Sequence, residues 1–253
     1  MLGLALDGVG DRVLARRTSS PGISVAAVFG LNGEPHPYLS TNPAENTASI
    51  AAQALWHATG DEGGVELTVY KGIPLQSGMG SSAASAVAAV VAVNALLDTP
   101  LPTPALLEHA LEGEKYASGG LHADNVAPCL LGGLVLCPRV LLPQAIPLPV
   151  PAGVSAVLIH PNLQVNTAQA RRGLARGYTM EQWLSQQGYL AGFIAACAAS
   201  DVDLMRRTLK DVIIEPQRAA AVPCFDAVRE AALRAGLMKQ PGRLFFLVPK
   251  VDG

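Results

Sequence analysis

Apolar residues recur along this chain with two different periods, and the shorter period predicts strands. Within residues 65–70, Val65, Leu67 and Val69 alternate with other residues, as expected for a strand with one buried face. Residues 23–29 form a second short run rich in apolar side chains, and residues 154–159 form a third. We therefore expect strands in both halves of the chain.

The longer period, of three to four residues, predicts helices. Between residues 48 and 59, Ile50, Ala54, Leu55 and Ala58 form one apolar stripe. A helix rich in small residues is expected from about 83 to 97, where the proline-rich segment 98–104 stops it. Further helices are predicted over residues 105–117, 190–199, 201–210 and 225–236, with Gly236 as the last C-cap and a polar helical region at 164–172.

Prolines mark the best position for a domain boundary. Pro143, Pro147, Pro149 and Pro151 crowd a short window that lacks any helical period. We predict one domain over residues 1–145 and a second over 146–253. Because strands and helices are mixed in both blocks, the fold class predicted is α+β.

Composition restricts the function classes. Half of the 253 residues are hydrophobic and 15% are charged, which is enough apolar material for a sizeable core. The net charge is −2 without a basic run, so nucleic acid is not an expected partner. The first residues lack the basic region of a signal peptide, and the longest apolar helix is shorter than the ~20 residues that a bilayer span needs. These observations predict a cytoplasmic protein that does not bind membranes.

The four cysteines, Cys129, Cys137, Cys197 and Cys224, form no C-x-x-C pair. The chain also lacks clustered histidines. We expect these cysteines to be small buried apolar residues in a reducing compartment, and neither zinc ligands nor disulfides.

Residues 72–86 combine a loop rich in glycine and serine with the start of a helix. Gly78 and Gly80 allow a backbone turn with positive φ, and Ser81 and Ser82 are candidate caps of the helix that follows. A helix N-terminus exposes N–H groups and a partial positive charge, which favour a phosphate. The segment therefore predicts a phosphate-binding loop, with an ordinary glycine-rich hairpin as the alternative.

Two common phosphate-binding patterns are excluded. No lysine directly precedes the serines, as a Walker A loop requires, and the third glycine of a dinucleotide fold is missing. The string P-x-x-x-G-M-G-S-S-A-A instead resembles the central motif of the GHMP small-molecule kinases. Its residues are Pro74, Leu75, Gln76, Ser77, Gly78, Met79, Gly80, Ser81, Ser82, Ala83 and Ala84.

A second segment, residues 112–128, places several ionisable side chains around a glycine turn. Glu112, Glu114, His122 and Asp124, with Asn125, could hold a magnesium ion, orient a hydroxyl and bind an amino group. Alternatively, the glutamates are surface charges of a helix and Asp124 and Asn125 form an ordinary turn. The position of this segment, about thirty residues after the phosphate loop, favours the functional interpretation.

The second segment narrows the resemblance to the homoserine kinase branch of the GHMP family. The string His122–Pro128, followed by Leu-Gly-Gly at 131–133, is similar to that branch. Two later segments agree, His160-Pro161 with Thr167–Arg171, and Val212–Arg218. The likeness extends from Leu2 to about Gly236. It implies a two-domain architecture with an N-terminal mixed sheet and helices and a C-terminal ferredoxin-like α/β sandwich.

The resemblance also implies a reaction and a set of ligands. The reaction is the transfer of a phosphoryl group from ATP to the side-chain hydroxyl of L-homoserine, in threonine biosynthesis, and a homodimer is the expected assembly. Residues 74–84 would wrap the ATP phosphates, with Asn46 near the nucleotide base. Glu114 and a hydroxyl of Ser81 or Ser82, with Ser82 preferred, would hold Mg²⁺.

The amino acid would be bound by His122, Asp124, Arg171 and Arg218, and paired guanidinium donors suit its carboxylate. Arg171 would also face the transferring phosphoryl group, with Thr167 one helical turn earlier. Asp124 either takes the hydroxyl proton or orients the amino group; the sequence leaves both open, because a strong base is not strictly required in such transfers. On their own residue types, the arginines would be surface charges, Thr167 an N-cap and His160 structural.

The chain departs from the family pattern at both ends. It starts just past the expected position of a first motif rich in serine, asparagine and glycine, and it lacks a glycine-rich third motif after Gly236. We therefore expect a fold that is incomplete at both ends, with reduced stability and activity. Another small-alcohol kinase of the same family and a non-catalytic nucleotide-binding remnant stay open as alternatives.

Overall fold

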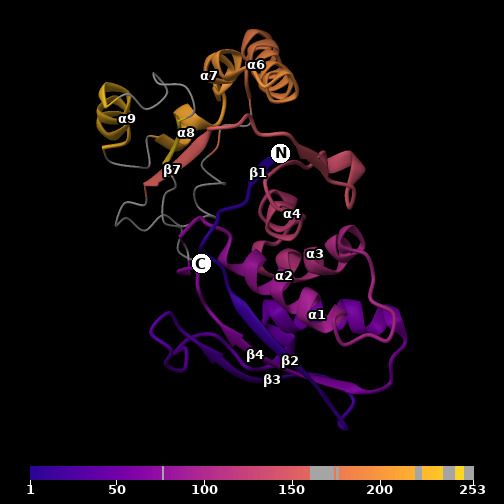
Figure 1. Cartoon of the computed structure of the whole chain (residues 1–253). Coiled ribbons are helices and arrows are strands. Elements are labelled where there is room, and N and C mark those ends of the chain that lie inside the picture. Colours follow the sequence, from indigo (N-terminus) through magenta and orange to yellow (C-terminus); the bar gives the residue numbers. More distant parts are fainter. Residues whose placement is uncertain (76, 160–173, 175–176, 220–223, 236–242, 248–253) are drawn as a thin grey trace. The chain divides into compact units, whose positions relative to one another are not determined.

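The computed structural model describes residues 1–75, 77–159, 174, 177–219, 224–235 and 243–247. Tertiary contacts divide the chain into two units. The first contains Met1–Leu75 and Met79–Pro147, and the second contains Gln76–Gly78 and Leu148–Gly253. Figure 1 shows the elements of each unit.

A three-stranded mixed sheet forms one layer of the first unit. Its order is β2 (Arg12–Thr18), β4 (Gly64–Tyr70), β3 (Gly22–Phe29), so β4 is central. β4 runs antiparallel to β2, with Arg12 opposite Tyr70, and parallel to β3. The alternating residues of β4, Val65, Leu67 and Val69, are at most 1% exposed, which confirms the predicted strand and its buried face.

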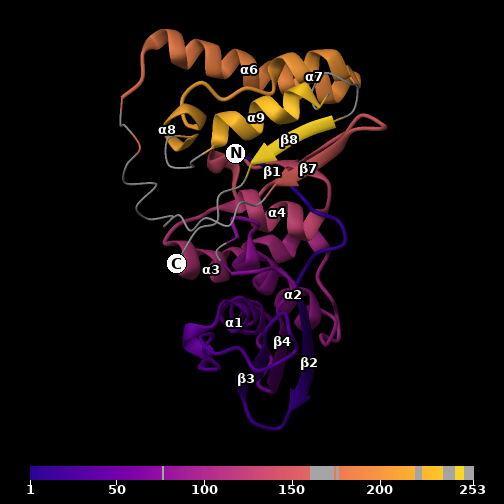
Figure 2. The same ribbon diagram turned by 90° about the vertical axis from the view of Figure 1, so that its left-hand side faces the viewer.

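Three helices, α1 (Thr47–Thr59), α2 (Ser81–Asn94) and α3 (Leu106–Ser118), pack against one another beside this sheet. Both ribbon views place them on one face of β2–β4–β3 (Figures 1 and 2). Small residues let the helix axes approach closely. A Cβ on Gly113 of α3 would lie only 2.6 Å from the Thr47 carbonyl oxygen of α1. Glycine at position 113 therefore sets the distance between α1 and α3.

The first unit also contains a second small sheet, on which helix α4 (Ala123–Leu131) packs. Its order is β1 (Leu2–Leu4), β5 (Leu134–Leu136), β6 (Ile146–Leu148), and β1 is antiparallel to β5. Helix α4 packs on β1 so tightly that a Cβ on Gly3 would lie 1.8 Å from the Asp124 carbonyl oxygen. Short 3-10 helices occur at Pro43–Glu45, Thr103–Ala105 and Arg139–Leu141.

The second unit contains a parallel pair of strands, β7 (Ser155–Ile159) and β8 (Arg243–Leu247). Its described helices are α6 (Met180–Ala199), α7 (Val202–Thr208), α8 (Glu215–Ala219) and α9 (Phe225–Arg234). α6 starts with a capping box, in which Thr179 and Gln182 exchange hydrogen bonds, and it packs on α7.

The predicted fold class, α+β, is confirmed by the helices and strands of both units. Within the described residues, the predicted helices and strands are present, several with different ends. α2 ends at Asn94 instead of residue 97, and α6 begins ten residues before the predicted 190. β2, α4, α8 and the short strands β5, β6 and β8 were not expected.

The apolar stripe predicted for α1 is wrong, because Ala58 is exposed and the buried face contains Ala51, Ala52 and Trp56. The polar helical region 164–172 and Gly236 lie outside the described residues, and α9 has Ala235 at its C-cap.

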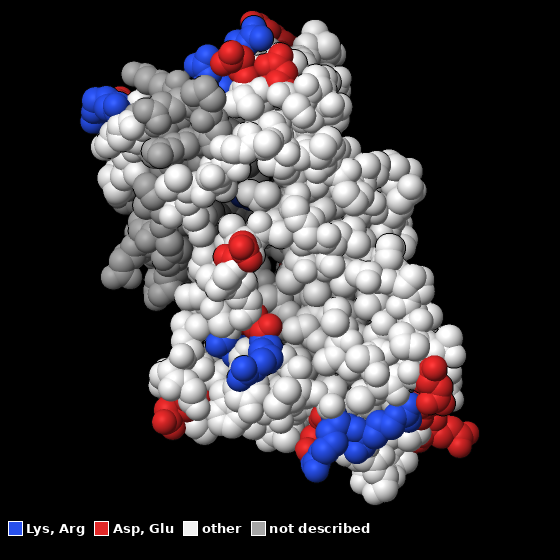
Figure 3. Space-filling model, viewed as in Figure 1, with Lys and Arg blue, Asp and Glu red and all other residues white. Residues whose placement is uncertain are grey.

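Three other expectations concern the surface and the cysteines. Cys137 and Cys197 are buried as predicted, but Cys129 and Cys224 are exposed, so the prediction of four buried thiols is wrong. Within the described residues, no helix has the length and apolarity to cross a membrane. On the face shown in Figure 3, the described charged side chains form small groups, several of them containing both signs.

Candidate active site

The predicted phosphate loop connects β4 to α2. Gly78 and Gly80 both have a φ of +73°, the left-handed conformation that glycine adopts without strain. Gly80 is the N-cap of α2 and, having no side chain, offers no capping acceptor. The start of α2 therefore has the features of an anion site, a partial positive charge and backbone N–H donors.

Ser81 and Ser82 do not cap α2, so this prediction was wrong. Both belong to the first turn of the helix, after the N-cap. Ser81 Oγ donates to the carbonyl oxygen of Ile73 at 2.9 Å, which joins the two ends of the loop. Ser82 Oγ donates to Glu114 Oε2, also at 2.9 Å. The two hydroxyls thus have different hydrogen-bond partners: that of Ser81 lies within the loop, and that of Ser82 lies on α3.

Glu114 lies on α3 and is only 4% exposed. Its contact with Ser82 places a carboxylate and a hydroxyl side by side at the N-terminus of α2. Hard oxygen ligands of this kind fit Mg²⁺, which also takes water and phosphate oxygens and needs few protein ligands. Within the described residues, no group of three or more His, Cys, Asp and Glu could hold a metal without such help.

Glu112, two positions earlier on α3, has a different environment. Its side chain is 48% exposed and lies 3.4 Å from Lys115 Nζ, one helical turn away. Glu112 is therefore a surface charge of a helix, as the alternative interpretation of the segment 112–128 proposed for both glutamates. The two glutamates therefore separate into one buried at the loop and one in solvent.

The N-terminus of α4 brings further predicted residues toward the loop. Asp124 lies in its first turn, and Asp124 Oδ1 is buried without a hydrogen-bond partner in the described part of the chain. Asn125 lies against the loop, because a Cβ on Gly80 would be 3.0 Å from Asn125 Cβ. His122 is the half-buried N-cap of α4. A turn at this position, as in the alternative interpretation, is excluded.

Asn46 occupies the N-cap of α1 and is 7% exposed. Its Oδ1 accepts from the backbone N–H of Ala48 at 3.0 Å, and its Nδ2 donates to the Ser40 carbonyl oxygen at 2.9 Å. These bonds use the amide for capping, which favours a structural role over contact with a base.

The described structure does not test the four remaining predicted residues. Gln76, Thr167 and Arg171 lie outside the described residues. Arg218 lies on α8 in the second unit and is exposed.

One group of residues at the loop was missed. Asp11 and Lys71 form a buried ion pair next to Gly72, where the loop begins. The only signal in the sequence was a lysine directly after a predicted strand and directly before the glycine-rich segment. Nothing in the sequence pointed to Asp11, which is sixty residues away.

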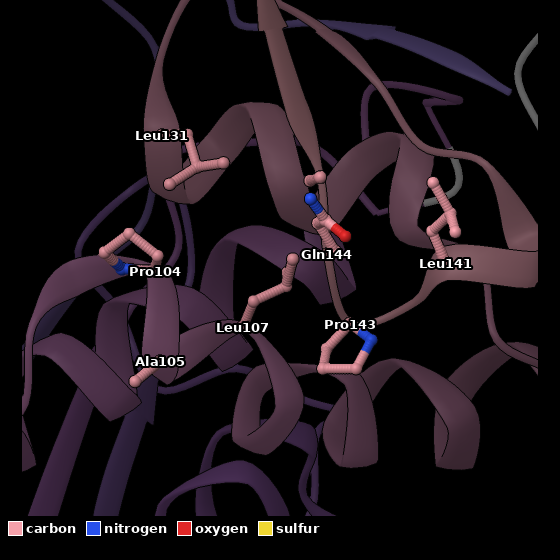
Figure 4. A pocket seen from close by; sticks show the side chains of 8 residues that line it. Pro104, Ala105, Leu107, Leu131, Leu141, Pro143 and Gln144 are labelled. Atoms are coloured by element: carbon pink, nitrogen blue, oxygen red, sulfur yellow. The ribbon is translucent and has the colours of Figure 1, made fainter.

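A hollow of about 410 Å³ lies elsewhere in the first unit. Figure 4 shows its lining, which comes from the 3-10 helix Thr103–Ala105, α3, the end of α4 and the segment after Arg139. Except for Gln144, its labelled side chains are apolar, and it includes none of the predicted site residues. Its lining residues are Pro104, Ala105, Leu107, Leu131, Leu141, Pro143, Gln144 and Ala145.

Comparison with known proteins identifies the class first. The family described as GHMP kinases N terminal domain matches residues 46–133, which contain the loop, Glu114 and Asp124. A solved mevalonate kinase from Methanococcus jannaschii has a TM-score of 0.61 over 89% of this chain and 75% of its own, at 12% identity, so it shares the fold.

Closer relatives identify the branch. A homoserine kinase from Xanthomonas campestris pv. campestris is 44% identical over 92% of this chain and 70% of its own length. One from Chlorobium phaeobacteroides is 38% identical over 93% and 76%. The crystal structure of homoserine kinase from Cytophaga hutchinsonii has a TM-score of 0.84 at 40% identity, covering 94% and 74%. The chain belongs to the homoserine kinase family, as the resemblance implied.

Proposed function

We propose that this chain transfers the γ-phosphoryl group of ATP to the side-chain hydroxyl of L-homoserine, giving ADP and O-phospho-L-homoserine, a step of threonine biosynthesis. Its membership of a kinase family supports the use of ATP, and relatives named homoserine kinase at 34–44% identity support the substrate. The observation that carries the proposal is the contact between Ser82 and Glu114 at the N-terminus of α2.

Residues 74–84 would bind the ATP phosphates, with the first turn of α2 directed at them. Backbone N–H groups and the helix dipole stabilise negative charge without any reorganisation during the reaction. The left-handed backbone at Gly78 and Gly80 supports this role, since a Cβ there would be strained. Phosphoryl transfer depends mainly on such positioning and charge neutralisation.

Ser82 and Glu114 would hold Mg²⁺. The ion supplies neutralisation of the charge on the phosphate oxygens when it is bound. The role of Glu114 is to keep a carboxylate fixed and largely shielded from water, and the role of Ser82 is to hold that carboxylate at the start of α2. Both side chains are therefore preorganised for a cation.

Asp124 and His122 would face the amino acid, with Asn125 added because it lies against Gly80. The buried Asp124 Oδ1 without a partner is the kind of acceptor that a substrate amino group or hydroxyl would satisfy. Arg171 and Arg218 would bind the carboxylate, Arg171 would also face the phosphoryl group, and Thr167 would stand near it.

The matched pair Glu114 and Glu112 tests the proposal. We expect E114Q to lower kcat/KM for ATP by about 100-fold or more at saturating homoserine, because a fixed carboxylate that supports the cation is lost. We expect E112Q, on the same helix but in solvent, to stay within about twofold of the wild type. Release of ADP, followed with a coupled assay, measures both.

Equal activity of E114Q and the wild type would show that Glu114 is not part of the active site. A panel of small alcohols in the same assay separates homoserine from the substrates of other GHMP kinases. ATP binding by calorimetry without turnover of any alcohol would instead identify a nucleotide-binding remnant. Cytoplasmic location and a homodimer stay part of the proposal, and light scattering on the purified chain tests the dimer.

A further inference from the structure

A buried ion pair lies directly beside the phosphate loop. Asp11 precedes β2 and Lys71 follows β4, and the pairing of Arg12 with Tyr70 brings the two charged residues together. Their side chains are 0% and 3% exposed. Burial lowers the pKa of Lys71, because it disfavours the charged ammonium, while the Asp11 carboxylate opposes this shift.

The pair belongs to a closed network of hydrogen bonds. Asp11 Oδ2 accepts from Lys71 Nζ and from Ser85 Oγ, the latter at 2.5 Å. Lys71 Nζ also donates to Ser85 Oγ at 2.7 Å and to the Ser81 carbonyl oxygen at 2.9 Å. All three ammonium donors are therefore used inside the protein.

This network holds both ends of the loop. At the first end, Asp11 Oδ1 accepts from the backbone N–H of Gly72 at 2.9 Å and of Ile73 at 3.2 Å. At the second end, Lys71 holds the carbonyl of Ser81 in the first turn of α2. The fit around the first end is tight, because a Cβ on Gly72 would lie 1.9 Å from the carbonyl oxygen of Gly10.

Stability alone is a weak reason for such a pair. Taking two charges out of water is costly, and apolar residues of similar size often give equal or greater stability. What an apolar pair cannot do is accept from Gly72 and Ile73 or donate to Ser81. We infer that Asp11 and Lys71 are positioning residues for phosphate binding, which fix both ends of the loop so that the start of α2 meets the ATP phosphates. This inference rests on the proposed use of ATP.

Two nearly isosteric double variants separate positioning from folding. D11L/K71M replaces the pair by apolar residues, and D11N/K71M removes both charges but keeps an acceptor for Gly72 and Ile73. The readout is displacement of trinitrophenyl-ATP by ATP and by AMP, which lacks the β- and γ-phosphates. Unfolding would weaken both nucleotides equally, whereas a displaced loop weakens ATP more than AMP.

We expect D11L/K71M to fold and to lose at least tenfold in ATP affinity, with AMP affinity changed less than twofold. D11N/K71M should recover part of that loss. The control E66Q alters the exposed pair Arg16–Glu66, which joins the same two strands, and should bind both nucleotides like the wild type.

An unchanged ratio of ATP to AMP affinity in D11L/K71M would overturn the inference. If neither double variant folds, S85A, which deletes one hydroxyl of the network, decides it. A loss of twofold or more for ATP alone supports the inference, and equal affinity overturns it. A wild-type chain that binds no ATP would contradict the proposed function instead, so the two failures are distinguishable.

Discussion

The two ends of the β2–β4 ladder use the same kind of interaction for different purposes. At one end, Asp11 and Lys71 are buried and hold the phosphate loop. Toward the other, Arg16 and Glu66 pair across the same strands at 2.6 Å, with side chains 75% and 31% exposed. Burial makes the first pair costly to break and fixes its geometry. Because the second pair is solvated, it contributes little to the free energy of unfolding. We therefore expect functional constraint at the Asp11–Lys71 end of the ladder and little at the Arg16–Glu66 end.

The largest effect should follow from breaking the buried pair on one side. K71M leaves the Asp11 carboxylate buried without its cation, and we expect it to lower the free energy of unfolding by about 3 kcal/mol or more. Urea denaturation measures this. A variant as stable as the wild type would show that the carboxylate is satisfied by Ser85, Gly72 and Ile73 alone.

Glycines at the two ends of the β2–β4 ladder provide the next test of the difference between these ends. A Cβ on Gly72 would lie 1.9 Å from the Gly10 carbonyl oxygen, and one on Gly64 would lie 1.6 Å from that of Ser20. Both G72A and G64A should therefore destabilise the fold, by about 1–3 kcal/mol, through overpacking against backbone. Only G72A should also weaken ATP relative to AMP, because only Gly72 belongs to the loop. Equal ratios in the two variants would contradict the difference between the ends.

The exposed pair should matter least among the charged contacts that join the strands. We expect R16A to change the free energy of unfolding by less than about 1 kcal/mol, since Arg16 is largely solvated. Raising the salt concentration should reduce even this effect. A loss as large as that of K71M would mean that exposure does not separate the two pairs.

Asp61 pairs with Arg17 of β2. We expect this pair to make the free energy of unfolding slightly dependent on pH. The Gly63 N–H, and then Arg17, hold the pKa of Asp61 below its usual value. A carboxylate with a lowered pKa in the folded state stabilises the fold above its ordinary pKa, and this contribution is lost as the pH falls through the lowered value. D61N should therefore remove part of the acid sensitivity of unfolding, measured below about pH 4. Identical acid profiles would contradict this assignment.

The sequence predicted the parts of the site that are local in the chain. The glycines of the loop and the helix after it follow from residue type, and Glu114 follows from the motif and its distance from the loop. The contacts between distant segments could not be predicted. Asp11 reaches the loop because β2 pairs with β4, and Asn125 reaches Gly80 because α4 packs on α2. Serines before a helix also suit capping, so the actual partners of Ser81 and Ser82 required the fold.

Phosphorylation of L-homoserine by ATP is the activity that we propose for this chain. The most direct measurement is phosphorus NMR of the purified chain with ATP, Mg²⁺ and L-homoserine. We expect the signals of ADP and of a phosphate monoester to form together and to depend on homoserine. Both signals should nearly disappear in E114Q but not in E112Q. ADP and inorganic phosphate without the ester, or an ester that forms equally well in E114Q, would contradict it.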